Sequence, residues 1–238
     1  AQSRAATRQK NMQEYYAMWV HQVKTPIAAL RLLLQNKNDE GQMTEELSEL
    51  FGIEQYVEMA LQYQRLDSET TDFVFEETDL DEIIRRKYAR QFIAKKISLS
   101  YEPVETTVIT DKKWLSFVIE QVISNAVKYT KTGGIKIYLE DGDGTMSVPV
   151  QKASHRKEDD GENSGMKSVR LVIEDTGIGI RAEDLPRICE MGYTGCNGHE
   201  GQHSSGIGLY LCSRILKKLG HTFSITSKEG VGTVVKIG

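Results

Sequence analysis

An apolar stripe near the start of the chain places the tightest constraint on its fold. Apolar residues recur there in steps of three and four, the period of one helix face; they are Met12, Tyr16, Trp19, Val23, Ile27, Leu30 and Leu34. This stripe predicts a helix over about residues 3–35, ended by the polar turn 36–41. A second stripe, after a cap at Thr44, predicts another helix; it comprises Leu47, Leu50, Ile53, Val57 and Leu61. Two antiparallel helices cannot bury both stripes against each other, so we expect a four-helix bundle built from two chains, and hence a homodimer.

Polar residues lie beside the first stripe at one turn of the predicted helix. His21 is followed by Gln22 and, about one turn later, by Thr25, so that the three side chains can meet one reacting group. Pro26 has no amide hydrogen to donate to the carbonyl of Gln22, and should bend the helix there. Taken alone, the segment is also compatible with an ordinary surface histidine next to a tolerated proline.

Composition excludes several classes of protein. The chain has 238 residues, 39% of them hydrophobic and 27% charged, with a net charge of −4, which is ordinary for a soluble protein. No run approaches the ~18 apolar residues of a membrane span and no signal peptide opens the chain, so we expect a soluble intracellular protein. Net acidity, without a basic stripe interleaved with aromatic residues, disfavours nucleic-acid binding.

The cysteines and the charge distribution add two further expectations. Three cysteines without a close pair indicate reduced thiols; a zinc site of Cys189, Cys196, His199 and His203 is conceivable but disfavoured by its spacing. Residues 1–37 carry six Lys or Arg, whereas residues 38–68 carry eight Asp or Glu, so the two predicted helices should attract each other. The basic opening suits either a segment just inside a membrane or a solvated face.

The pattern changes after a polar bridge at residues 66–71. Short alternating runs predict strands at 73–75, 97–101, 107–109, 135–139, 169–173, 222–226 and 232–237. Asp79 and Asp111 should cap helices, a short helix is expected at 181–188, and another helix at about 207–219. The long polar segment 141–167 predicts a mobile insertion. The mixture of elements indicates an α+β sandwich with helices on one face of a mixed sheet.

Four stretches of this second part carry residues suited to nucleotide chemistry. On the helix that Asp111 should cap, Gln121 and Asn125 share a face and Lys128 follows, which offers a carboxamide for Mg²⁺, a cation for phosphate and, at Tyr129, a ring for a base. Any one of these could be ordinary surface.

The other three stretches are rich in glycine. Asp175 ends a predicted strand, and Gly177 and Gly179 let the backbone come close to a ligand. Residues 204–209 open a helix, where free amides favour phosphate. Residues 230–233 precede the last strand. A strand-to-loop turn, a helix cap and a hairpin turn would explain them separately.

In this order the motifs resemble those of sensor histidine kinases. Residues 21–26 are similar to the phosphoacceptor box, and the four later stretches to the N box, the aspartate-glycine box, the glycine-rich lid box and the last glycine-threonine box of the Bergerat ATP-binding fold. The loop from Cys189 to Ser205 looks like the ATP lid of the short peptide-antibiotic-sensing kinases. The resemblance implies a helical dimerisation and phosphotransfer hairpin at 1–68 and a catalytic ATP-binding domain at 72–238.

The resemblance also implies roles for single residues. His21 would accept the phosphoryl group, with Gln22 and Thr25 beside it; Thr25 stands where the family positions a water for dephosphorylation. Towards ATP, the implied set is Asn125 for Mg²⁺, Lys128 for phosphate, Tyr129 along the adenine, Asp175 for its amino group, Gly177 and Gly179 in the adjoining loop, Gly206, Gly208 and Leu209 in the lid box, and Thr233 supporting the adenine site.

The implied activity is ATP-dependent autophosphorylation of His21 and transfer to an aspartate of a response-regulator receiver domain. The implied partners are a second copy of the chain and a membrane-embedded sensor segment or transporter, in the cytoplasmic portion of a bacterial inner-membrane protein. Three positions depart from the family pattern. Gln22 replaces the acidic neighbour of the histidine, Ser204 replaces the first lid glycine, and Gln121 cannot activate water as a carboxylate would. Two alternatives therefore stay open: an ATP-gated clamp and a non-catalytic dimeric scaffold.

Overall fold

The structure is a computed structural model that describes residues 11, 15, 18–19, 22–23, 25–30, 32, 53, 55–63, 65–66, 73–84, 97–102, 106–148, 167–195 and 205–238, with only the backbone at 142–148 and 167–168. The chain forms two compact units, one of residues 1–71 with 190–211 and one of 72–189 with 212–238. Each unit is described by itself. The predicted domains 1–68 and 72–238 stay a prediction, since the bridge at 67–72 lies outside the described residues.

The first unit contains two helical segments. Helical residues occur between 11 and 32 and again between 53 and 66. The rings of Tyr15 and Tyr63 stack with their centroids 4.0 Å apart and their planes 8° apart. Tyr15 stands early in the first segment and Tyr63 late in the second, which is the pairing that an antiparallel hairpin requires.

The same unit includes the loop and helix start at 190–211. Gly192 N donates to Gly206 O at 3.0 Å, which closes the two ends of this loop on each other. The Ser205 hydroxyl contacts the Met59 sulfur at 3.8 Å, and the Tyr210 ring centroid lies 6.5 Å from that of Tyr63. The loop ends therefore pack on the second helical segment.

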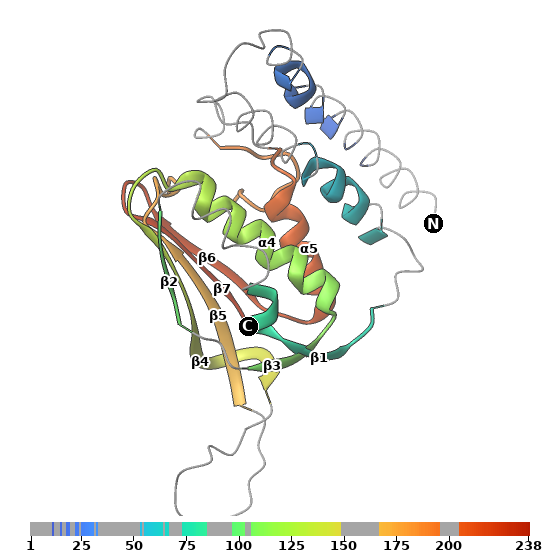
Figure 1. The fold of residues 1–238 in the computed structure, drawn as a ribbon, viewed down its shortest axis with the longest axis vertical. Helices are drawn as coiled ribbons and strands as arrows, with labels where there is room; N and C mark the ends of the chain where they lie inside the picture. Colours follow the sequence, from blue (N-terminus) through green and yellow to red (C-terminus); the bar gives the residue numbers. More distant parts are fainter. Residues whose placement is uncertain are drawn as a thin grey trace, which may run out of the picture. The chain divides into compact units, whose positions relative to one another are not determined.

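The second unit is built on a mixed sheet (Figure 1) of five strands in the order β2-β4-β5-β7-β6. Its strands are β2 (Ser98–Tyr101), β4 (Gly134–Val148), β5 (Lys167–Asp175), β6 (Phe223–Lys228) and β7 (Gly232–Ile237). β2 pairs with β4 in parallel, and the other neighbours are antiparallel. A separate antiparallel pair is formed by β1 (Glu76–Asp79) and β3 (Thr107–Thr110).

Two helices cover one face of the five-stranded sheet (Figure 1): α4 (Lys112–Tyr129) and, from Cys212 onward, α5 (Gly208–Leu219). α4 begins as its sequence predicts, because the Asp111 carboxylate accepts from the amides of Lys113 and Trp114 at 3.0 and 3.1 Å. Asp79 likewise accepts from the amides of Asp81 and Glu82. Both predicted caps are confirmed.

The core lies between these helices and alternate residues of the sheet. Strand register places Ile137, Ile173, Val235 and Ile225 opposite one another in one cross-strand row. The neighbouring row consists of Leu139, Leu171, Ile237 and Phe223. The side chains of Val118, Ile119 and Ile123 on α4 are fully buried, with 0% exposure, so they fill the space above these rows. The sandwich predicted for this part of the chain is confirmed.

Three sequence expectations about elements are wrong in detail. Residues 73–75 are not a strand, and β1 begins only at Glu76. The reason is that the Phe73 ring packs on Trp114, and Val74 N donates to the Asp111 carboxylate instead of to the carbonyl of a neighbouring strand. Residues 181–188 form turns, with amides bonded both three and four residues back, and Pro186 has no amide hydrogen with which to continue a helix.

The third error concerns the limits of the expected insertion. β4 continues to Val148 past an irregularity between Asp141 and Met146, and β5 begins at Lys167, so both strands extend into the segment assigned to a loop. These extensions are mostly polar and lack the alternation of apolar and polar residues by which a strand is recognised in a sequence. Backbone pairing between β4 and β5 makes them strands nevertheless. Residues 149–166 lie outside the described residues.

Candidate functional site

The two apolar rows of the sheet are followed by a polar one. Register places Ile135, Asp175, Thr233 and Ser227 opposite one another on β4, β5, β7 and β6. Because side chains alternate along a strand, this row points to the same face as the buried rows beside it, the face that α4 covers. A carboxylate and two hydroxyls thus end an otherwise apolar sheet face.

Asp175 is held by two backbone amides. Its carboxylate accepts from Gly177 N at 2.8 Å and from the backbone of Thr233. Burial raises the pKa of Asp175 above its usual 3.8, the Gly177 and Thr233 amides lower it in part, and neighbouring Glu174 raises it further. The carboxylate is therefore partly desolvated and fixed, as a group that reads a hydrogen-bond donor must be.

The loop after Asp175 is fastened to α4 on one side. Ile178 N donates to Tyr129 O at 3.2 Å. A Cβ on Gly177 would lie 2.6 Å from Tyr129 O and 2.8 Å from the Asp175 carboxylate. Gly177 is needed because a side chain would separate the loop from the end of α4.

The same loop is fastened to the β6–β7 turn on the other side. Gly230 N donates to Ile178 O at 2.8 Å. Gly179 has φ +69°, and a Cβ there would lie 2.1 Å from Lys228 O. The sequence suggested that Gly177 and Gly179 allow a close approach to a ligand; the structure adds that protein backbone already occupies the space of their side chains.

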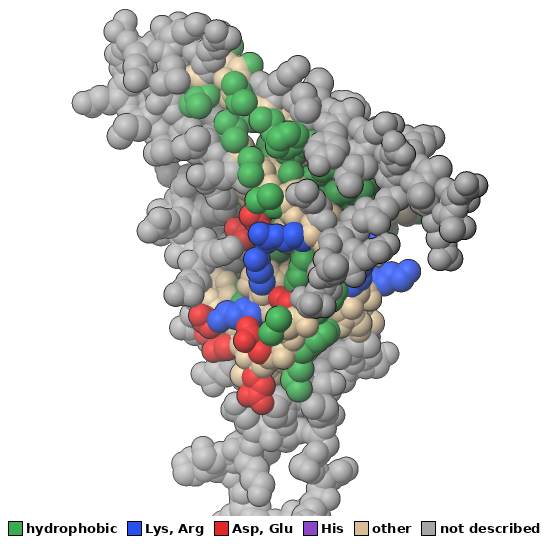
Figure 2. Space-filling model, turned by 90° about the vertical axis from the view of Figure 1, so that its right-hand side faces the viewer, with side chains coloured by type: hydrophobic (Ala, Val, Ile, Leu, Met, Phe, Trp, Pro, Cys, Tyr) green, Lys and Arg blue, Asp and Glu red, His purple; other side chains and the backbone are tan. Residues whose placement is uncertain are grey.

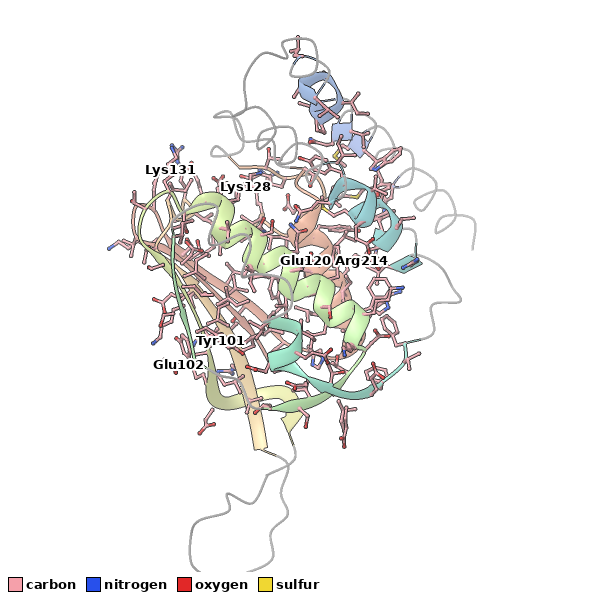
Figure 3. The ribbon with its side chains drawn as sticks, in the orientation of Figure 1. Tyr101, Glu102, Glu120, Lys128, Lys131 and Arg214 are labelled. Carbon is pink, nitrogen blue, oxygen red and sulfur yellow. The ribbon has the colours of Figure 1, made fainter. Side chains whose placement is uncertain are left out.

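α4 carries the other predicted residues of the nucleotide site. Asn125, Lys128 and Tyr129 are half-buried on its last turns, where the Asp175 loop is attached. The Lys128 ammonium lies 5.3 Å from the Tyr129 ring centroid. Lys128 and Lys131 lie at this end of the helix (Figure 3), and Glu120 lies farther back along it. Positive charge therefore gathers at one end of α4.

The lid-box residues belong to the first unit. Gly206 has φ +64°, and a Cβ there would lie 2.4 Å from the Gly192 carbonyl carbon. Gly208 and Leu209 are the first residues of α5, which continues into the second unit at Cys212. The Gly206 backbone therefore closes the loop ends, in addition to its predicted role towards phosphate.

The predicted phosphoacceptor lies outside the described residues. His21 is not described; Gln22 and Thr25, which both follow it, are helical and half-buried, and Pro26 is buried. The roles of His21, Gln22 and Thr25 stay predictions.

Sequence reasoning missed Ser227. Its hydroxyl lies 2.8 Å from Ile180 N, 2.8 Å from Gly232 O and 2.9 Å from the Thr233 hydroxyl. One sequence feature could have revealed it: Ser227 continues the alternation of Phe223 and Ile225, so it faces the same side of the strand as they do. It also lies six residues before Thr233, across a turn that contains glycine. Gly232 belongs to the stretch 230–233 that the sequence singled out, but sequence reasoning assigned it no role of its own; at φ +139° its Cβ would lie 1.9 Å from Asp175 O.

The residues present fit a nucleotide with its metal ion. Asp175 offers a partly buried acceptor beside the Thr233 hydroxyl, which suits a base with an exocyclic amine. Within the described part of the chain, no cluster of three or more His, Cys, Asp or Glu could form a metal site. Mg²⁺ needs only one or two protein ligands when it binds with substrate phosphates, so Asn125 suits that role.

Comparison with known proteins decides the family. Residues 110–238 match the family model described as histidine kinase-, DNA gyrase B- and HSP90-like ATPase. The matched segment is more than half of the chain and contains α4, the Asp175 loop, α5 and the β6–β7 hairpin. The chain belongs to this ATPase family.

Curated relatives within the ATPase family are sensor histidine kinases. The chain is 34% identical over 229 residues to sensor histidine kinase YxdK of Bacillus subtilis (strain 168), covering 93% of this chain and 63% of the relative. It is 31% identical over 235 residues to sensor protein kinase GraS of Staphylococcus aureus (strain N315), covering 96% and 61%. The resemblance to sensor histidine kinases is confirmed, and the chain spans less than two thirds of these relatives.

Solved structures of histidine kinases share the fold. The Acinetobacter baumannii histidine kinase AdeS superposes with a TM-score of 0.58 at 21% identity, over 92% of this chain and 97% of that one. Full-length ShkA in complex with AMPPNP gives a TM-score of 0.57 at 18% identity, over 94% and 45%. At such identities the likeness shows the ATPase-family fold alone.

Proposed function

We propose that the chain is the catalytic part of a two-component sensor histidine kinase, which autophosphorylates on His21 with ATP and passes the phosphoryl group to an aspartate of a response-regulator receiver domain. The polar row at the end of the sheet carries the proposal, because its fixed Asp175 carboxylate lies beside α4 in a chain whose curated relatives are sensor histidine kinases.

The residues of the site have separate tasks in this proposal. Asp175 accepts from the exocyclic amine of adenine and Tyr129 lies along the ring, while Asn125 holds Mg²⁺ and Lys128 meets phosphate oxygens. Phosphoryl transfer needs positioning and charge neutralisation more than covalent chemistry from the protein. Mg²⁺ supplies charge neutralisation at the phosphates. The ShkA structure, which is a complex with AMPPNP, supports nucleotide binding by a protein of this fold.

Exposed apolar side chains in the first unit support a homodimer formed through a four-helix bundle. Ile27, Leu32, Val57 and Leu61 are 49, 61, 40 and 40% exposed in the single chain. Figure 2 shows hydrophobic side chains gathered on the visible surface of the helical part. Three of the four belong to the stripes that the sequence predicts to be buried, and a second chain would cover them.

A membrane-embedded sensor segment or transporter is the proposed upstream partner. The chain spans 63% of YxdK and 61% of GraS, whose names describe sensors. No helix in the described part of the chain is long and apolar enough to cross a membrane. We propose that this part lies on the cytoplasmic side of a bacterial inner membrane.

Labelling with γ-³²P-ATP and Mg²⁺ tests the kinase activity. The chain, His21→Gln and His221→Gln are compared, because His221 is a half-buried histidine outside the proposed chemistry. A phosphoramidate is lost in acid and survives base. Label with this lability in the first and third proteins, and none in His21→Gln, is expected.

Two other outcomes would replace the kinase proposal. Steady phosphate release with no protein label would favour an ATP-gated clamp, although the carboxamide of Gln121 cannot take a proton from water. Failure to bind ATP would favour a non-catalytic dimeric scaffold. The departures at Gln22 and Ser204 are the sequence features that support the scaffold.

A further inference from the structure

The Ser227 hydroxyl connects three parts of the nucleotide site. It contacts Ile180 N in the loop after Asp175, Gly232 O at the start of β7, and the Thr233 hydroxyl, at 2.8, 2.8 and 2.9 Å. All these residues belong to the second unit. Ser227 therefore joins the Asp175 loop to the strand that carries Thr233.

Counting protons assigns the direction of each bond. A serine hydroxyl has one proton and two acceptor positions. A backbone carbonyl can only accept, so Gly232 O takes the Ser227 proton, and a backbone amide can only donate, so Ile180 N occupies one acceptor position. The remaining acceptor position takes the proton of Thr233. This assignment satisfies all three contacts.

The assignment leaves Thr233 as an acceptor. Its hydroxyl proton is directed at Ser227, so only lone pairs are available to another group. Thr233 lies opposite Asp175 across β5 and β7, and the Thr233 backbone hydrogen-bonds the Asp175 carboxylate. Two acceptors thus lie side by side in the polar row. Facing position 6 of a purine, such a pair favours adenine, whose 6-amino group is a donor, over guanine, whose 6-carbonyl oxygen is an acceptor.

We propose that Ser227 is a positioning residue that holds the Thr233 hydroxyl as an acceptor and thereby contributes to the selection of adenine over guanine nucleotides. The inference rests on the proposed nucleotide site and adds a determinant of its specificity. Ser227 touches no nucleotide in this account; it acts through Thr233 and the Asp175 loop.

Affinities of the full chain for ATP and GTP, each with Mg²⁺, test the proposal by calorimetry. The variants are Ser227→Ala, Ser227→Thr, Thr233→Val and the double change. Ser224→Ala is the matched control, because Ser224 lies on the same strand but is exposed. We expect Ser227→Ala to reduce the ATP-to-GTP affinity ratio about tenfold, the order of one hydrogen bond. Ser227→Thr keeps a hydroxyl at this position and should therefore keep the ATP-to-GTP affinity ratio of the unchanged chain, and Ser224→Ala should not alter that ratio.

The double change separates positioning from general support. If Ser227 acts through Thr233, Ser227→Ala has no further effect on the ratio once Thr233 is Val. An equal loss of ATP and GTP affinity, or an additive effect in the double variant, would overturn the inference and assign Ser227 a structural role. This readout remains valid if Ser227→Ala lowers thermal stability, because the ratio compares two ligands on one protein.

The proposed kinase function and the proposed role of Ser227 can fail independently of each other. If the chain discriminates ATP from GTP as described but His21 is never labelled, the kinase proposal fails and the role of Ser227 stands. If the chain labels His21 but the ratio is unchanged in Ser227→Ala, the kinase proposal stands and the role of Ser227 fails. If neither nucleotide binds, both are overturned.

Discussion

Thr233 stands directly opposite Asp175 on neighbouring antiparallel strands, and its backbone hydrogen-bonds the Asp175 carboxylate. The same carboxylate also accepts from Gly177 at 2.8 Å. The residue proposed to read the base, Asp175, is thus fixed by the strand beside it and by its own loop. The polar row can be tested at each of these attachments.

Replacing Asp175 by Asn should separate binding from stability. We expect the affinity for ATP to fall at least about tenfold, because a charged acceptor contributes about 1.5–3 kcal/mol. The thermal midpoint of the unliganded chain should stay or rise at neutral pH, because Asn removes a charge whose burial is unfavourable. Calorimetry and thermal melts measure both. A strongly lowered midpoint with unchanged affinity would contradict the assignment.

The affinity for ATP should weaken in mild acid. Because burial raises the pKa of Asp175 above 3.8, its carboxylate takes up a proton at a higher pH than an exposed aspartate does. The protonated group no longer offers a charged acceptor, so the dissociation constant should increase as the pH falls through the raised pKa. Asp175→Asn is the control, since it keeps the titration of the ATP phosphates but lacks the carboxylate. Parallel pH profiles for the two proteins would contradict this.

Gly179 and Gly220 form a matched pair for testing backbone packing. Both have positive φ, +69° and +79°, but a Cβ on Gly220 meets nothing within 4 Å, whereas one on Gly179 would lie 2.1 Å from Lys228 O. Alanine at Gly220 should cost about 1–2 kcal/mol from its left-handed backbone alone. Alanine at Gly179 should lower the thermal midpoint further and weaken ATP binding. Equal effects of the two changes on both measurements would show that the Lys228 contact is unimportant.

The second unit should lose stability as the pH falls below about 6.5. Burial lowers the pKa of His221 from 6.5, so below that value the unfolded chain binds a proton that the folded chain does not. The loss extends from the ordinary pKa down to the lowered one. His221→Gln should remove this component, because an amide can keep the 2.9 Å contact with the Thr110 hydroxyl without titrating. Melts between about pH 7.5 and pH 5 measure it, and an unchanged slope in the variant would exclude His221.

A charge on the exposed helical stripe should weaken the proposed dimer. Leu61 is 40% exposed in the first unit, and Leu61→Glu would place a carboxylate in the predicted interface. Val74→Glu is the control, since Val74 is 66% exposed and lies in the second unit. Light scattering after gel filtration should show a shift to monomer for the first variant alone. A dimer that tolerates Leu61→Glu would place the interface elsewhere.

Much of the local structure could be predicted because its causes are local. Asp79 and Asp111 cap helices through amides two or three residues away, and the alternation of apolar residues located β6 and β7. The error at 73–75 arose because Phe73 packs on a residue 41 positions later, Trp114, a distance over which strand propensity says nothing. The helix expected at 181–188 was wrong because the effect of Pro186, which has no amide hydrogen with which to continue a helix, was not considered.

The sequence by itself was enough to identify the family and to propose the nucleotide-site residues, because the order and spacing of Asn125, Asp175, Gly206 and Thr233 can be read directly from the linear chain. Only the tertiary structure decided that Asp175, Thr233 and Ser227 form one row. That row depends on the register of three strands, which non-local backbone pairing sets. The role of a hydroxyl such as Ser227 follows from its three partners, and no spacing in the sequence brings those partners together.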